Sequence, residues 1–147
     1  MNPKFLLATT EDIPAILILM EKFYAIDRYP FDKKTAEKCL KEFIGQQNLG
    51  RIWVLKLEEK IIGYVIVTFG YSFEYKGRDA FGDEGFIEEA YRHKGFGKMA
   101  AEFLLQELEK EKINVLHLEV EKHNPAKRLY KRLGFKDSGR ILMTRWL

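Results

Sequence analysis

The segment of this chain best suited to chemistry is a basic, glycine-containing turn at residues 92–97, with the sequence Arg-His-Lys-Gly-Phe-Gly. A strand-like run at residues 80–87 precedes it, and a strong helical pattern follows it. Glycine allows close approach of the backbone, and the unpaired N–H groups of a helix N-terminus point towards an anion. We therefore expect a phosphate-binding cradle, formed by Arg92, His93, Lys94, Gly95, Phe96, Gly97 and Lys98.

Other interpretations of the same turn fit less well. Gly95, Gly97 and Ala100 match the dinucleotide-binding pattern, and Glu119 lies about 20 residues further on. In that fold the first glycine follows its strand almost directly, whereas the mostly charged residues 88–94 intervene here. No Gly-Lys-Ser/Thr sequence follows at the spacing of a Walker-type loop. Taken alone, the turn is equally compatible with a solvated surface loop.

The composition predicts one ordinary domain over residues 1–147. The formal net charge of +3 is too small to indicate a nucleic-acid-binding protein. A single cysteine, Cys39, excludes an intramolecular disulfide, and it is expected to be a core thiol rather than a nucleophile. The three histidines lack metal-ligand spacing, and the longest apolar run, residues 13–20, is shorter than the roughly 20 residues of a membrane span. We expect a cytoplasmic protein with no metal, no membrane and no nucleic-acid partner.

Hydrophobic periodicity predicts the elements that position the turn. Their expected order is β-α-α-β-β-β-α-β-α-β, with residues 71–79 as a loop. The expected strands are 5–8, 51–57, 61–69, 80–87, 115–120 and 140–147, and the expected helices are 13–24, 33–44, 98–111 and 125–133. The fold class is therefore α/β, with a mixed, mostly antiparallel central sheet and about four helices on its faces.

A second block, residues 123–135, carries a family resemblance. Its sequence, His-Asn-Pro-Ala-Lys-Arg-Leu-Tyr-Lys-Arg-Leu-Gly-Phe, is similar to the motif Asn-x-x-Ala-x-x-x-Tyr-x-x-x-Gly-Phe of the GNAT superfamily of N-acetyltransferases. The pattern Arg-x-x-Gly-x-Gly at residues 92–97 resembles the acyl-CoA pyrophosphate motif of that superfamily. Together they imply a GNAT-like sheet of six to seven strands, with acetyl-CoA as co-substrate. The interval from Asn124 to Tyr130 is one residue short, so either Asn124 or His123 fills the family's Asn position.

Acetyl transfer to an amine needs a base, because a lysine-like amine is neutral in only about one molecule in 10³ at pH 7. Asp83 and Glu84 are the nearest acids on the central strand, and strand alternation is expected to send them to opposite faces. Resemblance to the spermidine/spermine branch favours Asp83, with Glu84 or a water chain as alternatives. Tyr130 is the expected general acid, which would protonate the departing thiolate.

The resemblance also suggests contacts for the rest of the coenzyme. The N–H of Ile87 would polarise the thioester carbonyl, and Phe86 and Glu88 would bond the pantetheine amides. Asn124 would contact CoA, and Lys127 belongs to a basic run that could meet the 3′-phosphate. By analogy, Tyr24 lies in the wall of the acceptor site.

The resulting hypothesis is an acetyl-CoA-dependent N-acetyltransferase that acts by direct transfer in a ternary complex. Its acceptor would be the primary amine of a small molecule or peptide, and the superfamily implies a possible homodimer. The alternatives are a non-catalytic, acyl-CoA-binding regulatory module and a nucleic-acid-binding protein. The sequence leaves the acceptor and the oligomeric state open.

Overall fold

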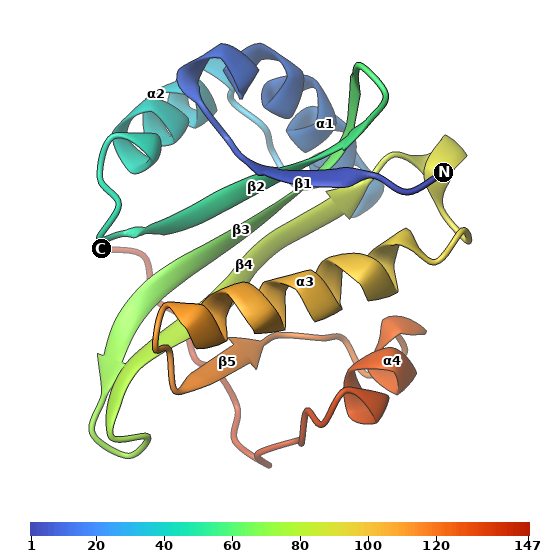
Figure 1. Cartoon of the computed structure of the whole chain (residues 1–147). Coiled ribbons are helices and arrows are strands. Elements are labelled where there is room, and N and C mark those ends of the chain that lie inside the picture. The colour runs from blue at the N-terminus through green and yellow to red at the C-terminus, as the bar shows by residue number, and fades with distance from the viewer.

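A five-stranded sheet forms the middle layer of the computed structural model, which describes residues 1–147 (Figure 1). The strand order is the chain order. Neighbours are antiparallel except for the last two, which are parallel. The strands are β1 (Lys4–Leu7), β2 (Gly50–Leu57), β3 (Lys60–Ser72), β4 (Gly77–Ile87) and β5 (Val115–Leu118). The mixed, mostly antiparallel sheet is confirmed, but it has five strands instead of the predicted six to seven.

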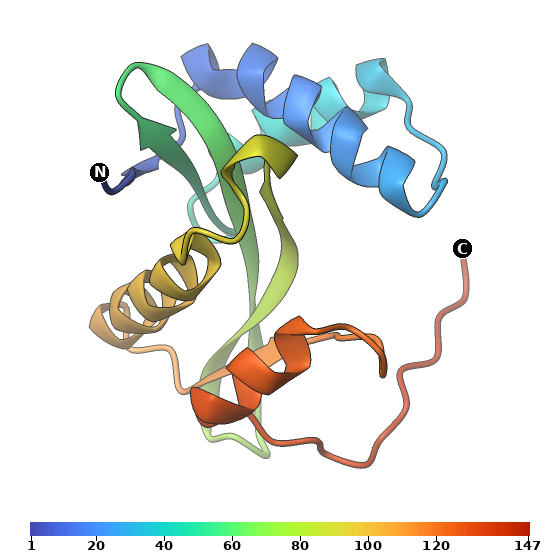
Figure 2. The same cartoon turned by 90° about the vertical axis from the view of Figure 1, so that its right-hand side faces the viewer.

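The chain forms four helices, as predicted, and the first three cover the sheet. Figure 2 shows the sheet between two layers, with the third helix on one side and the first two on the other. The helices are α1 (Ile13–Ile26), α2 (Lys33–Ile44), α3 (Phe96–Lys110) and α4 (Ala126–Arg132). Two single 3₁₀ turns, Thr10–Asp12 and Glu89–Tyr91, precede α1 and α3. None of the helices is long and apolar enough to cross a membrane.

Each helical layer packs on its own set of sheet residues. The apolar face of α1 meets strand residues that include Tyr64, Ile66 and Phe86. On the opposite face of the sheet, Leu104 and Leu108 of α3 pack on a different set of strand residues, which includes Ala80. This division defines an α1–α2 face and an α3 face of the sheet.

Three sequence predictions are wrong. Residues 140–147 form no strand, although their apolar pattern predicts one. Residues 71–79 are mostly strand, because β3 and β4 extend until Ser72 pairs with Gly77 and only residues 73–76 form the turn. Cys39 is exposed on α2, not in the core, because that helix turns other residues, such as Leu40, towards the sheet.

Candidate active site

The outer edge of β4 is half paired and half open. β5 pairs with residues Asp79 to Gly82 only, so residues 83–87 have β3 as their single neighbour. The N–H of Glu88 donates to the carbonyl of Ile62, at 2.8 Å. Because hydrogen-bonding directions alternate in an antiparallel ladder, the backbone groups of Gly85 and Ile87 face the open edge. A Cβ placed on Gly85 would have no atom within 4 Å, so there is also free space over one face of the strand at this position.

Phe86 and Glu88 already have partners inside the protein. The same alternation turns the backbone groups of Phe86 towards β3, and its ring is buried on the α1–α2 face. The carboxylate of Glu88 pairs with Lys22 of α1 and with Lys60, whose Nζ lies 3.2 Å away. The hydrogen bond from Lys22, together with the pair to Lys60, lowers the pKa of Glu88. The open edge therefore offers Gly85 and Ile87, rather than Phe86 and Glu88, to a ligand.

A β-bulge in β4 decides where the two candidate acids lie. Ile66 pairs with Glu84 and Val67 pairs with Gly82, which leaves Asp83 as the extra residue. The bulge resets the alternation of the strand. Ala80 packs on the α3 face, yet Phe86, an even number of residues further on, packs on the α1–α2 face.

Glu84 is half-buried and is held by two tyrosines from different elements. The hydroxyl of Tyr24 on α1 donates to Oε2 at 2.6 Å, and the hydroxyl of Tyr64 on β3 donates to Oε1 at 2.8 Å. Burial raises the pKa of Glu84, and the two hydrogen bonds act in the opposite direction. Burial and the carboxylate together raise the pKa values of Tyr24 and Tyr64, so both hydroxyls keep their protons. The result is a carboxylate fixed at both oxygens.

Asp83 lies close enough for its charge to contribute to the raised pKa of Glu84. Asp83 is the extra residue of the bulge, so strand alternation alone does not determine its direction relative to Glu84. Asp83 is exposed, and partial exclusion of water by neighbouring atoms raises the pKa of its carboxyl. No cation contributes to the pKa of either acid. Two acids without a basic partner are suited to accept a proton or to attract a cationic amine.

The turn between β4 and α3 has the form of an anion cradle. His93 (φ 61°) and Gly95 (φ 83°) are both left-handed, which bends the backbone into the start of α3 at Phe96. The first intrahelical bond runs from Met99 N–H to Gly95 O, and no protein group accepts from the N–H groups of residues 93–98. A Cβ on Gly97 would touch only the tip of Ile87, at 4.0 Å, so there is room for a side chain at the start of α3.

The basic side chains of the turn differ in their contacts. Arg92 Nε donates to the carbonyl of Ile87 at 2.8 Å, and its guanidinium lies over the ring of Phe86. Arg92 thus ties the turn to the end of β4. His93 and Lys94 are exposed, and Lys98 makes a long pair of 3.8 Å with Glu102.

The fourth helix lies near the N-terminal half of α3, on the side of the open β4 edge (Figures 1 and 2). Tyr130 is half-buried there, with its ring 5.7 Å from that of Phe135, and burial raises its pKa. The side chain of Asn124 accepts a 2.9 Å bond from Ala126 N–H and so caps α4. His123, Asn124 and Lys127 line a basic hollow of about 670 Å³ along this helix.

The predicted residues thus form three groups: the acids on β4, the turn before α3, and α4. No direct contact joins Tyr130 to either acid. Tyr64 was not predicted as a site residue, because the sequence pattern of a strand does not distinguish it from other buried residues.

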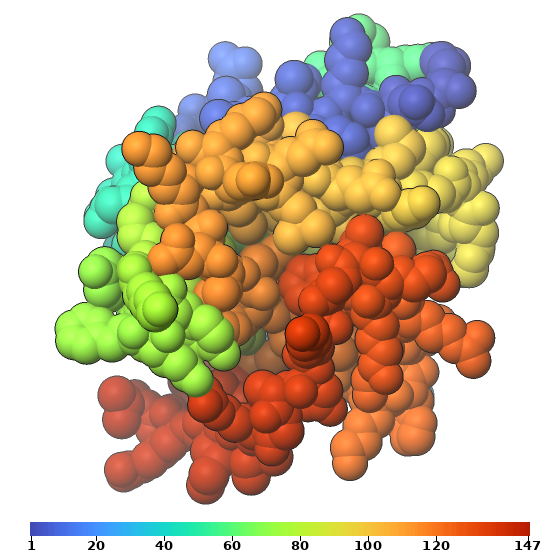
Figure 3. All heavy atoms as spheres, turned by 60° about the horizontal axis from the view of Figure 1, so that its bottom comes forward, coloured from blue at the N-terminus to red at the C-terminus, as the bar shows by residue number.

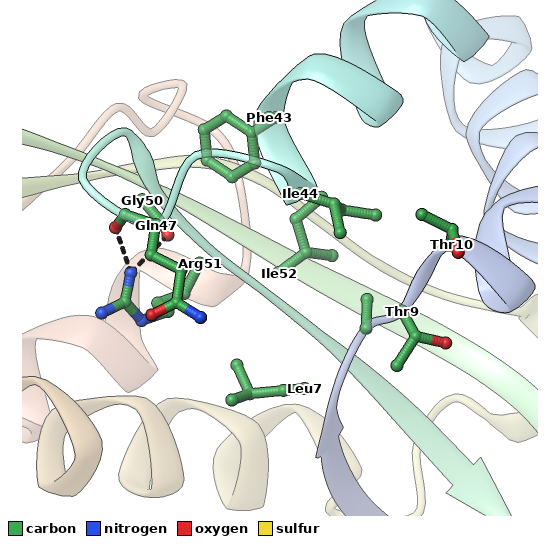
Figure 4. A pocket seen from close by; sticks show the side chains of 10 residues that line it. Leu7, Thr9, Thr10, Phe43, Ile44, Gln47, Gly50, Arg51 and Ile52 are labelled. Carbon is green, nitrogen blue, oxygen red and sulfur yellow. Dashed lines mark hydrogen bonds between the residues drawn. The ribbon is translucent and has the colours of Figure 1, made fainter.

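A further hollow of about 280 Å³ lies between β2, the end of α2 and the β1–α1 connection (Figure 4), where Arg51 bonds the carbonyls of Gln47 and Gly50. It contains none of the predicted residues.

Comparison with known proteins points to one family. The model of the Acetyltransferase (GNAT) family matches residues 16–135. An integron cassette protein from the mobile metagenome of Cole Harbour Salt Marsh is 30% identical, with TM-score 0.87 over 97% of this chain and 90% of that one. No curated protein sequence matches.

Two more distant structures share the fold. A predicted acetyltransferase from Clostridium acetobutylicum, solved with acetyl-CoA, has TM-score 0.80 at 18% identity over 97% of this chain and 96% of that one. A ribosomal-protein-alanine N-acetyltransferase from Brucella melitensis biovar Abortus 2308 has TM-score 0.78 at 17% identity over 98% and 99%.

Proposed function

The chain belongs to the acetyltransferase (GNAT) family, and from this premise we propose that it transfers an acetyl group from acetyl-CoA to a primary amine, directly and in a ternary complex. The acceptor we propose is a small molecule or a peptide. The observation that carries the proposal is the juxtaposition, along one strand, of unpartnered backbone donors and two acids without a basic partner.

Free donors and empty space at the open edge of β4 and at the cradle fit the coenzyme. The N–H groups of residues 93–98 would bind the pyrophosphate, with the dipole of α3 and the charges of Lys94 and Lys98 in support. The outward backbone groups of Gly85 would bond the extended pantetheine arm. Bound acetyl-CoA supplies the acetyl group already activated as a thioester.

Glu84 is the base that we propose for the acceptor amine, with Asp83 as the alternative. An ammonium ion must lose a proton before its nitrogen can attack, and a carboxylate with a raised pKa is a better proton acceptor than an exposed one. The bonds from Tyr24 and Tyr64 keep the carboxylate in one orientation.

Tyr130 is the proposed general acid for the thiol that leaves. Its raised pKa keeps the hydroxyl protonated at neutral pH, so a proton is available. The N–H of Ile87 would donate to the acetyl oxygen, on which negative charge develops during transfer. Neither role requires a metal ion.

The proposal is tested by measuring CoA-thiol release with a panel of primary amines, together with calorimetric binding of acetyl-CoA. We expect saturable binding and at least one amine that releases thiol. Tyr130→Phe should lower kcat at least tenfold, with acetyl-CoA affinity unchanged, because general-acid catalysis contributes about 10²–10⁴-fold. Binding without turnover of any amine would favour a regulatory acyl-CoA-binding module, and unchanged kcat in Tyr130→Phe would remove its role.

A further inference from the structure

The segment around α4 concentrates the positive charge of this chain. Residues 122–136 contain six basic residues and no acidic residue. The other 132 residues contain 19 basic and 22 acidic residues, so the rest of the molecule is formally negative. The total charge of +3 therefore conceals a segment of +6 on a background of −3. The six basic residues are Lys122, Lys127, Arg128, Lys131, Arg132 and Lys136.

None of these six cations has an acidic partner in the protein. The ion pairs of the structure all involve other residues. Elsewhere on the molecule Lys22, Arg51 and Arg140 each meet a carboxylate. Five of the six are exposed, and Lys127 is partly exposed. A basic surface without internal partners attracts anions from solution.

Five of the six cations line the same hollow. This hollow, of about 670 Å³ along α4, is lined by Lys122, Lys127, Arg128, Lys131 and Arg132, together with His123 and Asn124, and these seven residues define the α4 surface. No Phe, Tyr or Trp side chain lines it. In the space-filling view the orange-red segment that includes α4 lies at the surface, next to the yellow start of α3 (Figure 3). The charges are therefore gathered where a partner can reach them.

The cations of α4 form two rows that match the spacing of an extended peptide. Lys127 and Lys131 are four residues apart, as are Arg128 and Arg132, so the members of a row lie about 6 Å apart along the helix axis. In an extended peptide, side chains on one side recur about every 6.6 Å. Acidic residues at alternate positions can therefore meet one row, and each arginine can bind a carboxylate through two hydrogen bonds.

Two other anions fit this surface less well. The 3′-phosphate of a bound coenzyme carries about −1.5 to −2 charges at pH 7, so it would neutralise at most two of the six cations. A nucleic acid duplex carries one charge about every 1.7 Å and would extend beyond α4, which is about 10 Å long, onto the negative remainder of the molecule. Single strands are bound by stacking on aromatic side chains, and no Phe, Tyr or Trp lines the hollow.

We propose that the α4 surface docks a short acidic segment of a partner protein, which lies extended along the helix. The inference goes beyond the proposed acetyl transfer and does not depend on it. Exposed ion pairs are individually weak and are screened by salt, so the complex is transient and salt-sensitive. Because a coenzyme leaves most of the cations free, docking persists when CoA is bound.

Fluorescence anisotropy of a labelled peptide tests the docking. The probe is an alternating Glu-Ser peptide of about eight residues with both ends blocked, so it offers no acceptor amine, and the matched probe has Gln in place of Glu. With the full chain and saturating CoA, we expect the Glu probe to bind at least about tenfold more tightly than the Gln probe. Its affinity should fall about tenfold between roughly 50 and 300 mM NaCl.

Two double variants locate the docking surface. Arg128→Gln/Arg132→Gln removes one row while keeping good helix formers, so affinity for the Glu probe should fall at least about tenfold and the far-ultraviolet circular dichroism should not change. The matched control is Lys34→Gln/Lys38→Gln, which removes two exposed, unpaired charges at the same spacing on α2. The control should bind the probe like the unmodified chain.

Four results would overturn the proposal. Equal binding of the Glu and Gln probes would remove the role of acidic residues, and an equal loss in the two double variants would remove the role of α4. Displacement of the Glu probe by CoA would assign the hollow to the coenzyme. Tighter binding of a duplex oligonucleotide with the same number of charges, lost in Arg128→Gln/Arg132→Gln, would assign the surface to nucleic acid.

Discussion

The two ends of the β4 site are built in opposite ways. At the cradle before α3, the donors are backbone N–H groups, the surroundings are open, and two left-handed residues set the shape. At Glu84, side chains from α1 and β3 converge on one carboxylate, and the surroundings are half-buried. The cradle is therefore fixed by local backbone conformation, and the acid is fixed by tertiary packing.

This difference predicts how each end fails. A backbone donor cannot be removed by substituting a side chain, so the cradle is disturbed by filling its space or straining its turn. The carboxylate depends on named side chains, so single conservative changes should alter its chemistry while leaving the fold intact. The following predictions test the contrast, from the largest expected effect to the smallest.

Replacement of the carboxylate should have the largest effect. Glu84→Gln keeps the size of the side chain but cannot accept a proton, so we expect kcat to fall by about 10²–10⁴-fold. Acetyl-CoA affinity, measured by calorimetry, should stay at the wild-type value. The matched variant is Asp83→Asn: a large loss there, with near-normal turnover in Glu84→Gln, would transfer the role of base to Asp83.

Filling the cradle should abolish coenzyme binding without unfolding the protein. We expect Gly97→Glu to weaken acetyl-CoA binding at least about 100-fold, because the side chain places bulk and negative charge in front of the free donors. An acidic residue in the first helical turn stabilises a helix, so the melting temperature should not fall. Gly97→Ala is the matched control and should bind acetyl-CoA much more tightly than Gly97→Glu. Normal affinity in Gly97→Glu would place the pyrophosphate elsewhere.

Removal of one tyrosine hydroxyl should change a pH profile. Burial raises the pKa of Glu84 and the bond from Tyr24 lowers it, so Tyr24→Phe should raise this pKa further. A base must be deprotonated to act, so the acid limb of kcat/KM should move to higher pH. Tyr29→Phe is the control, because Tyr29 is exposed and its hydroxyl has no bond to Glu84. An unmoved limb would show that Glu84 is not the titrating base.

The two cradle glycines should differ modestly in stability. Gly95 is left-handed, and a Cβ built on it would meet no atom within 4 Å, so Gly95→Ala adds backbone strain alone and should cost about 1 kcal/mol of unfolding free energy. Gly97 has no positive φ, so Gly97→Ala should be neutral or stabilising. Urea denaturation of both variants measures the difference. Equal effects would contradict the backbone geometry of the turn.

The same contrast explains what the sequence could predict. The turn before α3, the helix that follows it and the basic character of α4 depend on neighbouring residues, so local patterns were sufficient to predict them. That the turn binds phosphate stays a prediction. Tyr24 and Tyr64 meet Glu84 across 60 and 20 residues of chain, and no periodicity reports such a meeting. The bulge at Asp83 was equally hidden, because one extra residue leaves the composition of a strand unchanged.

The wrong strand prediction has a different cause. Residues 140–147 have strand-forming composition, but a strand also needs a neighbour for its hydrogen bonds, and in this chain no strand is placed beside them. Residues 71–79 show the opposite error, because a loop was predicted where the structure has mostly strand. Polar and aromatic residues suggested a loop, yet pairing between β3 and β4 extended the ladder to the last residues before the turn.

The bulge at Asp83 divides β4 into two lengths in which positions of the same parity face different helical layers. Before the bulge, Ala80 packs against α3. After it, Phe86, which has the same parity, packs against α1. A substitution that repacks one helix therefore leaves the other's contacts untouched. One strand thus serves two helices through different segments, and each segment can be redesigned by itself.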